Sequence, residues 1–298
     1  MRLSRIIRDE QIDILQTFFE DSIFVAFLAT RLSSKRPTLL SSRRDMGLGH
    51  DDLWYHSLYK AVLPLVNRSF HSIVANGDMV KAYVAEREKT SQAKIKVIPN
   101  GILLPPEYTD KPSVFTDISA ELWIGAVGNL KQVKRMDVFL GGLAVLSRRS
   151  RINYHAVILG EGPEESKLRN MADELGIAHR VHFMGAVEDV YAYMLNLDIG
   201  VLCSDKEGFS NAIMEYMACG LPVIATAVGG NVELVDASNG VLIPPGNSEA
   251  LGEALFELAE NASLRESKAS VSRQRIVERY SWSKTMAEWE EFYLSLLG

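Results

Sequence analysis

Two glutamates, Glu207 and Glu215, flank seven residues in the stretch Glu-Gly-Phe-Ser-Asn-Ala-Ile-Met-Glu. An ionised carboxylate offers only hydrogen-bond acceptors, so both side chains suit a ligand rich in hydroxyl groups. Ser210 or Asn211 can cap a helix that begins here, and the amides of a helix amino end attract phosphate. A sugar joined to a phosphate meets both conditions. The alternative is an ordinary capped helix with two solvent-facing acids, which the spacing alone favours.

A strand, a helix and a second strand are expected to position the two glutamates. The apolar run at residues 198–203 predicts a strand that ends shortly before Glu207. Gly220 ends the helix that follows. The apolar stripe of this helix is Ile213, Met214, Met217 and Ala218. Residues 222–226 predict the next strand, so Glu207 lies just ahead of the helix and Glu215 roughly two turns along it.

Strands and helices alternate along the chain, which is typical of α/β domains with parallel sheets. Strands are expected at residues 12–16, 37–41, 72–75, 95–98, 121–127, 154–159, 181–184, 198–203, 222–226 and 240–243. Helices are expected at residues 3–8, 21–32, 57–66, 163–175, 247–258 and 281–297, and further helices through Val80 and Tyr83, along 139–146, and between Ser210 or Asn211 and Gly220. In the helix at 21–32, Phe24, Phe27 and Leu28 are expected to lie on one face. The proline-containing stretch 103–119 predicts a linker.

The length of 298 residues suffices for two domains. We expect residues 1–104 to form the first and residues 105–280 the second, with residues 281–298 a helix returning to the first domain. The chain opens in what resembles the last turns of a helix, without the strand such a helix should follow. The amino-terminal sheet is therefore expected to be incomplete, with an uncovered edge and an uncovered apolar face.

Composition excludes several classes of function. The 32 basic and 38 acidic side chains give a net charge of −6, which argues against a nucleic-acid partner. Residues 1–70 carry a small basic surplus, so peripheral membrane contact stays open beside a solvated surface. Cys203 and Cys219 are expected to be free core thiols in a reducing compartment. His182 is expected to occupy a strand position, and no histidine spacing predicts a metal site. With no apolar run of spanning length and no signal peptide, the sequence predicts a soluble cytoplasmic protein.

Taken together, the motifs of the second half resemble those of the retaining glycosyltransferases of family four, which have the two-domain GT-B fold. The matching segments are 97–101, 126–128 with Lys134, 159–163, 181–185, 207–211 with Glu215, 218–223, 229–230 with Glu233, and 239–246. The resemblance implies two Rossmann-like domains with parallel sheets, the first incomplete. It also implies a nucleotide diphosphate sugar (UDP- or GDP-sugar) as donor, a polysaccharide or lipid-linked acceptor, and no required metal or cofactor.

The resemblance also implies roles for individual residues. Lys134 would neutralise the donor diphosphate, and Glu207, beside Gly208, would hold the transferred sugar; these two are the candidate catalytic residues. Glu215 would hold the ribose. The remaining candidate donor-binding positions are Gly128, Asn129, Gly160, Met184, Gly185, Phe209, Ser210 and Asn211. Among these, the backbone at Met184 and Gly185 would meet the base.

Two features depart from the family pattern. Asn129 stands where relatives often carry arginine, so Lys134 has less help with the diphosphate. The first strand and its glycine-rich loop are missing, and Arg43 and Arg44 stand where many relatives have a histidine. Either arginine is a candidate for acceptor-side contact; the alternative is a solvated pair.

Three functions remain open from the sequence. The first is a retaining glycosyltransferase, the second a truncated nucleotide-sugar-binding module without activity, and the third a sugar-nucleotide epimerase with the same fold. The base, the sugar and the acceptor are not identified by the sequence.

Overall fold

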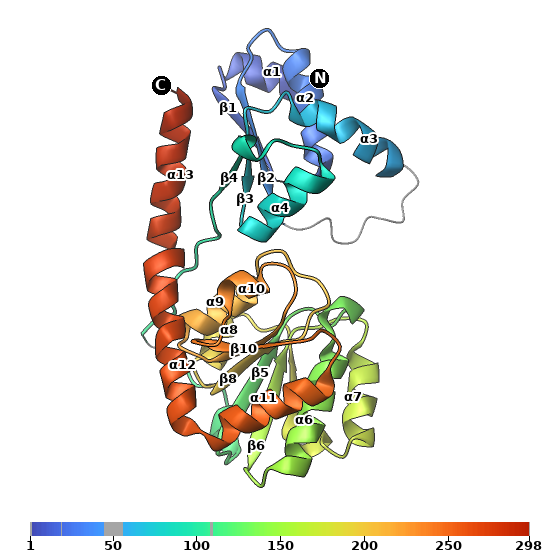
Figure 1. Ribbon diagram of the computed structural model, residues 1–298, viewed down its shortest axis with the longest axis vertical. Coiled ribbons are helices and arrows are strands. Elements are labelled where there is room, and N and C mark those ends of the chain that lie inside the picture. The colour runs from blue at the N-terminus through green and yellow to red at the C-terminus, as the bar shows by residue number, and fades with distance from the viewer. Residues whose placement is uncertain (1, 19, 45–55, 108–109, 298) are drawn as a thin grey trace. The chain divides into compact units, whose positions relative to one another are not determined.

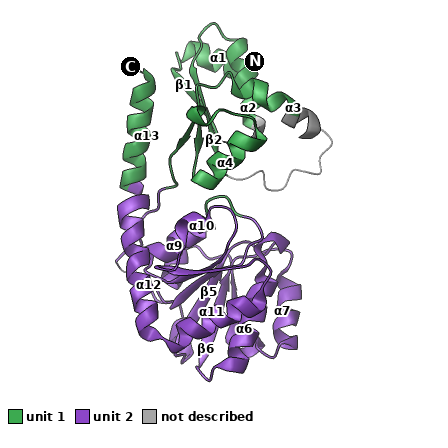
Figure 2. Cartoon of the chain, viewed as in Figure 1, with its two compact units in different colours: residues 1–100, 207–209, 283–298 green, residues 101–206, 210–282 purple. Residues whose placement is uncertain are grey.

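The computed structural model describes residues 2–18, 20–44, 56–107 and 110–297. The chain divides into two compact units, and each is built around a parallel β-sheet (Figures 1 and 2). Unit 1 comprises residues 1–100, 207–209 and 283–298, and unit 2 comprises residues 101–206 and 210–282. Two parallel-sheet α/β domains confirm the predicted fold class.

The sheet of unit 1 has four parallel strands in the order β1-β2-β3-β4. Its elements are α1 (Arg2–Asp9), β1 (Ile14–Thr17), α2 (Glu20–Arg31), β2 (Thr38–Arg43), α3 (His56–Asn67), β3 (Ser72–Ala75), α4 (Asp78–Arg87), a 3-10 turn (Gln92–Lys94), β4 (Ile95–Val97) and most of α13 (Trp282–Leu297). Each strand follows its neighbour in sequence, so the sheet grows in one direction only. Short helical crossovers between adjacent parallel strands produce this order.

Alternate residues of the strands face different helices. Leu39 packs with α2 and α3, whereas the next residue, Leu40, packs with Trp289 and Phe292 of α13. In the same way, Ile73 faces α4 and Val74 faces α13. The closing helix is thus anchored on unit 1 by two buried aromatic rings, whose burial stabilises it by a few kcal/mol.

The face of α2 that carries Phe24, Phe27 and Leu28 is not its most buried one. Ile23 and Ala26 are the residues buried against the sheet, while Leu28 is 57% exposed. Phe24 and Phe27 are only partly buried at the margin. Apolar side chains surround most of this helix, so the sequence pattern does not select one stripe over its neighbour.

Arg43 lies inside unit 1 and is not part of a solvated pair. It continues strand β2, is 5% exposed, and holds the carboxylate of Glu88 with two hydrogen bonds of 2.9 Å. Asn67 accepts a further bond from Arg43 and donates to Glu88 at 2.7 Å. A buried ion pair must be surrounded by such bonds, because an unpaired buried charge costs several kcal/mol. The solvated alternative is therefore wrong for Arg43.

The sheet of unit 2 has six parallel strands in the order β10-β9-β8-β5-β6-β7. Its elements are α5 (Val114–Asp117), β5 (Leu122–Val127), a 3-10 turn (Gln132–Lys134), α6 (Met136–Arg149), β6 (Tyr154–Leu159), α7 (Glu165–Glu174), a 3-10 turn (Ala178–Arg180), β7 (Val181–Gly185), α8 (Val190–Met194), β8 (Ile199–Leu202), α9 (Asn211–Ala218), β9 (Val223–Thr226), α10 (Asn231–Leu234), β10 (Gly240–Ile243), α11 (Ser248–Glu260), α12 (Ala262–Arg275) and a π-helix (Ile276–Tyr280). Helices α6, α7 and α11 bury one face in the large core of this unit.

On the other face, His182 takes the strand position expected for it. Its Nε2 lies 3.0 Å from Nδ1 of His155 on the adjacent strand, and the ring of Trp123 lies beside both. Burial lowers the pKa of each imidazole, and the neighbouring His182 lowers that of His155 further. One ring must donate and the other accept, so the pair is a neutral packing element at the amino ends of β6 and β7.

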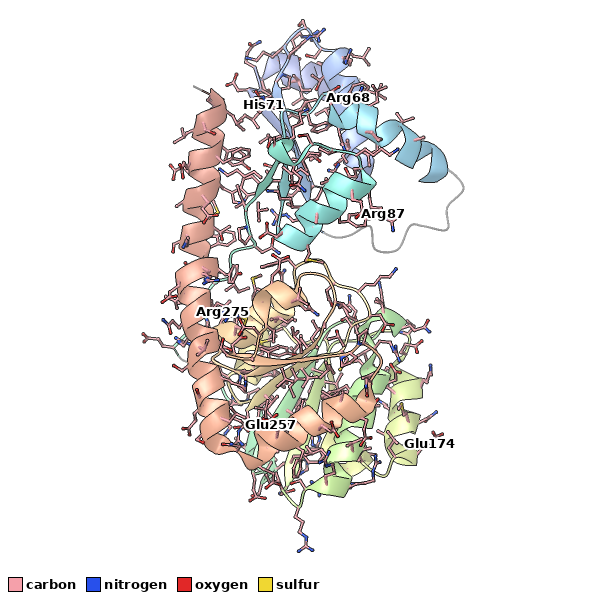
Figure 3. The ribbon with its side chains drawn as sticks, viewed as in Figure 1. Arg68, His71, Arg87, Glu174, Glu257 and Arg275 are labelled. Carbon is pink, nitrogen blue, oxygen red and sulfur yellow. The ribbon has the colours of Figure 1, made fainter. Side chains whose placement is uncertain are left out.

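Helix α12 is not predicted by the sequence, because its residues are mostly polar. Four basic side chains attach it to backbone carbonyls of unit 2: Arg265 to Leu258 and Ala259, Lys268 to Ala237 and Gly240, Arg273 to Ala218, and Arg275 to Leu234. Figure 3 shows Arg275 on α12 beside the body of the unit, and Glu174 at the outer edge of α7. Charge-assisted hydrogen bonds therefore attach α12 to the unit, whereas burial of apolar side chains attaches α6 and α11.

We expect Lys268→Met to lower the free energy of unfolding by about 1–3 kcal/mol, because two inward carbonyls lose their donor. Lys268 is 8% exposed, and its ammonium lies 3.2 Å from the Gly240 carbonyl oxygen. Lys167→Met is the matched control, since Lys167 is 74% exposed and pairs only with Glu164 in solvent. Urea unfolding of both variants measures the difference. Equal losses in the two would contradict the anchoring role of Lys268.

Candidate functional site

The strand order of unit 2 reverses between β5 and β8. From β5 the chain adds β6 and β7 on one side of the sheet, and it then returns to add β8, β9 and β10 on the other. The chain segments that leave β5 and β8 therefore continue toward opposite faces of the sheet from the carboxyl ends of these strands. Ligands of open α/β sheets bind at such a switch point.

Backbone hydrogen bonds join the loops that follow β5, β6 and β7. The amide of Gly128 donates to Leu159 at 2.9 Å, and the amide of Gly160 donates to the carbonyl of Gly185 at 2.7 Å. Gly160 has φ +132, and a Cβ there would lie 2.2 Å from the Gly128 carbonyl oxygen. Only glycine allows this approach. The three loops thus form one continuous rim.

Lys134 extends over Gly128. The side-chain carbons Cγ, Cδ and Cε of Lys134 lie 3.8 to 3.9 Å from where a Cβ of Gly128 would stand. Lys134 ends the 3-10 turn Gln132–Lys134 and is half-buried. Its stem therefore follows the backbone of the β5 loop, with Asn129 exposed beside it.

The loops after β5 and β8 are joined directly. The amide of Asp205 donates to the carbonyl of Val133 at 2.9 Å, and the carboxylate of Asp205 accepts from Arg135 at 3.0 Å. Sequence reasoning missed Arg135 and Asp205, because an arginine followed by aspartates reads as exposed charge. The contact brings the β5 loop with Lys134 next to the segment that leads into α9.

Helix α9 begins as expected. Ser210 is the N-cap residue, and its hydroxyl accepts from the amide of Ile213 at 3.4 Å. Tyr216 fixes the helix on the sheet, since its ring covers Gly200 and its hydroxyl reaches the carbonyl of Gly125. At the other end, Arg273 donates to the carbonyl of Ala218, the last residue of α9. The amino end of α9 is thus held beside the carboxyl end of β8.

Both glutamates are withdrawn from solvent, so the solvent-facing alternative is wrong. Glu207 is 9% exposed, and Glu215 is half-buried in the middle of α9. Among the residues that the structure describes, no hydrogen bond or ion pair satisfies the Glu215 carboxylate. Burial raises the pKa of this carboxyl, because removal from water disfavours the charged form. A half-buried carboxylate kept without a donor suits a ligand that brings hydroxyl groups.

Neutral groups surround Glu215. Burial, together with the negative charge of Glu215, raises the pKa of Tyr191 and of the Cys219 thiol to about 12 each. The Tyr191 hydroxyl donates to the Leu103 carbonyl at 2.8 Å. Cys203 is buried and, like Cys219, forms no disulfide. Neither thiol is therefore a reactive thiolate, in agreement with the expected core role.

The remaining candidate residues lie outside this rim or at its end. Met184 and Gly185 end β7, and both are half-buried. Arg44 belongs to unit 1, where it donates to Asn100 and lies over the ring of Trp289. Burial lowers the pKa of Arg44, partly offset by Tyr293. Arg43 and Arg44 are therefore both held by side chains of their own unit.

Within the described parts of the chain, no three His, Cys, Asp or Glu side chains gather in a way that could hold a metal ion. Over the same ranges, no helix is both long and apolar enough to cross a membrane.

Two parallel-sheet α/β domains of this kind define a GT-B-like fold. Residues 121–261 match the family model of glycosyl transferases group 1. Residues 1–104 match the model of glycosyltransferase family 4. Two separate parts of the chain thus match glycosyltransferase family models, and both models are similar to the family that the sequence motifs resemble.

Curated relatives are distant and longer than this chain. The N-acetyl-alpha-D-glucosaminyl L-malate synthase of Bacillus anthracis is 26% identical over 172 residues, which are 57% of this chain and 45% of that protein. The D-inositol 3-phosphate glycosyltransferase of Corynebacterium urealyticum is 28% identical over 242 residues, which are 75% of this chain and 56% of that protein. The chain thus spans about half the length of these relatives.

Solved structures share the fold. The Anabaena protein Alr3699/HepE, solved in complex with UDP, superposes with a TM-score of 0.86 at 22% identity and covers 99% of this chain and 81% of its own. A glycosyltransferase from Rickettsia africae superposes with a TM-score of 0.83 at 20% identity, and the superposition covers 99% of this chain and 80% of that protein. At this identity the likeness establishes the fold.

The pKa shift of Glu215 predicts an effect on stability. A carboxyl whose folded pKa is raised stabilises the fold below its unfolded pKa of about 4.3, and this contribution is lost as the pH rises through the folded value. We expect Glu215→Gln to raise the melting temperature at pH 7.5 by about 2 °C, with a smaller gain at pH 4.5. Glu174→Gln on the exposed end of α7 is the control. A lower melting temperature for Glu215→Gln at pH 7.5 would show that the carboxylate has a stabilising partner.

Proposed function

We propose that this chain transfers a sugar from a nucleotide diphosphate sugar, with UDP or GDP as the nucleotide, to a carbohydrate or lipid-linked acceptor. The observation that carries the proposal is the half-buried, unpaired carboxylate of Glu215 in the middle of α9. Support comes from the two glycosyltransferase domain matches and from the fold shared with a protein solved with UDP-glucose. Such a transferase contributes to polysaccharide biosynthesis.

The donor diphosphate is assigned to the crevice between the β5 and β8 loops. Lys134 supplies a compact positive charge on a flexible stem. The amides of Phe209, Ser210 and Asn211 at the start of α9 supply oriented donors and the positive end of the helix dipole. Gly128 and Asn129 offer backbone that a phosphate can approach closely. Together these groups stabilise the charge that develops on the leaving diphosphate.

The sugar and nucleoside are assigned to the two glutamates and to the end of β7. Glu215 accepts hydrogen bonds from the ribose hydroxyls, and Glu207, beside Gly208, accepts them from the transferred sugar. Backbone at Met184 and Gly185 meets the base. Gly160 keeps the rim next to Gly128 open to the donor.

Transfer proceeds with retention of configuration in this proposal. The bond from the anomeric carbon to the diphosphate oxygen breaks, and the acceptor oxygen bonds to the same carbon on the same face. The acceptor hydroxyl gives up its proton, and the departing diphosphate takes the electron pair. Orientation and electrostatic stabilisation carry the rate, with Lys134 and Glu207 in contact with the donor. No metal or cofactor is assigned a step.

The division of labour follows the expected domains. Residues 105–280 bind the donor, residues 1–104 bind the acceptor, and residues 281–298 form the returning helix. Arg44 is the better acceptor-side candidate of the two arginines, because Arg43 is already committed to Glu88. Peripheral contact of residues 1–70 with a membrane is a further part of the proposal, as is a cytoplasmic location.

A second candidate is a module that binds the nucleotide sugar without transferring it. The observation in its favour is that Arg43, one of the two acceptor-side candidates, is already committed to Glu88. Calorimetric titration with UDP and GDP, alongside transfer assays with UDP- and GDP-sugars, separates the two. Binding with turnover supports the transferase, and binding without turnover supports the module.

We expect Lys134→Ala to raise the dissociation constant for UDP or GDP by about tenfold or more, because the diphosphate loses a charged donor. Lys131→Ala is the matched control, since Lys131 is an exposed lysine of the same loop. Isothermal titration calorimetry measures both. Unchanged affinity in Lys134→Ala would remove the lysine from the donor site.

A further inference from the structure

Arg135 has an unusual backbone for a side chain of its size. It separates the 3-10 turn Gln132–Lys134 from α6 and has φ +49 and ψ +46, the left-handed helical conformation. This conformation costs a residue with a Cβ roughly 1 kcal/mol, and glycine would adopt it without strain. A bulky residue at such a position suggests that its side chain has a function.

The side chain of Arg135 joins two carboxylates. Its Nε and Nη2 each lie 3.0 Å from a carboxylate oxygen of Asp137, and its Nη1 lies 3.0 and 3.3 Å from the two oxygens of Asp205. The planar guanidinium can serve both partners at once, which an ammonium cannot. Burial alone would raise the pKa of Asp137, but its hydrogen bond and ion pair with Arg135 lower it.

The two partners of Arg135 belong to different parts of the unit. Asp137 lies in the first turn of α6, beside Arg135 itself, whereas Asp205 lies 70 positions along the chain from Arg135 in the loop after β8. Asp205 also donates its amide to Val133 at 2.9 Å. Lys134 therefore lies between two residues that are both tied to Asp205, and Glu207 follows Asp205 by two positions.

A third loop comes close to the same guanidinium. Gly246, after β10, has φ +72, and a Cβ there would lie 3.4 Å from Nη1 of Arg135. The guanidinium thus occupies the space between the loops that follow β5, β8 and β10. An exposed ion pair between two flexible side chains contributes little to stability. Here the backbones of Arg135 and Asp205 are each held by a hydrogen bond, Arg135 to Gln132 and Asp205 to Val133.

We propose that Arg135 is a positioning residue, which locks the β5 loop to the β8 loop through Asp205 and so holds Lys134 at the donor diphosphate. The identity of the ligand in this inference rests on the proposed function. The connection between the two loops does not, because the Arg135–Asp205 contact is present in the structure. Without the lock, Lys134 and the segment leading to Glu207 sample positions that do not bind phosphate, and affinity falls although the fold remains.

The test uses Arg135→Gly and Asp205→Asn in the full chain. Arg135→Gly removes the lock and relieves the backbone strain, so we expect little change in melting temperature and about a tenfold rise in the dissociation constant for UDP or GDP. Asp205→Asn is expected to give a similar rise, and the double variant no more than either single one, because both changes break one interaction. Asp173→Asn, an exposed aspartate of α7, is the control.

Hydrogen exchange separates this inference from the proposed function. Amides in residues 129–134 and 204–206 are expected to exchange faster in Arg135→Gly than in the unaltered chain, with or without nucleotide. Wild-type affinity in both single variants, or unchanged exchange in these segments, would overturn the lock. If the unaltered chain bound no nucleotide but exchange still accelerated, the lock would stand and the donor assignment would fail.

Discussion

The contact between the β5 and β8 loops is the interaction on which the site depends. A parallel sheet whose strand order reverses leaves these loops free to diverge, and that divergence makes room for a ligand. A backbone hydrogen bond from Asp205 to Val133 and the side chain of Arg135 draw them together again at one point. The loop that carries Lys134 is therefore held next to the segment that leads into α9.

Other contacts of unit 2 hold α9 in place beside the Arg135–Asp205 contact. The Ser210 cap, the Tyr216 ring over Gly200 and the Arg273 bond to Ala218 act on the start, the middle and the end of the helix. Glu215 precedes Tyr216, so its carboxylate is positioned by a buried aromatic neighbour. The desolvation of Glu215 costs stability in the free protein, and hydroxyl groups of a ligand would offset that cost. Stability and binding thus oppose each other at this residue.

Much of this architecture could be predicted from the sequence. Buried strands such as β5 and β8 are uninterrupted apolar runs, and glycine and serine mark the ends of α9, so periodicity and capping suffice there. Helix α12 could not be predicted, because its attachment depends on basic side chains meeting carbonyls that are distant in the sequence. Which residues of α2 are buried could not be predicted, because apolar side chains surround most of that helix. The burial of Arg43 could not be predicted, because its partner Glu88 is 45 positions away in the sequence.

Within the site, residue types were informative and contacts were not. The spacing of Glu207 and Glu215 indicated acceptors for hydroxyl groups, but nothing in the sequence indicates that Glu215 lacks a donor. The left-handed backbone of Arg135 is equally hidden, since glycine is the usual signal for it. Long-range pairs such as Arg135 with Asp205 appear only once the strand order is known.

The most direct test of the account is the structure of this chain crystallised with UDP or GDP. The account predicts that the diphosphate lies at the carboxyl ends of β5 and β8, within hydrogen-bond distance of Lys134 and of the first amides of α9, with the ribose hydroxyls on Glu215. A nucleotide bound elsewhere on the chain, or a diphosphate in that crevice with Glu215 facing away from the ribose, would contradict it.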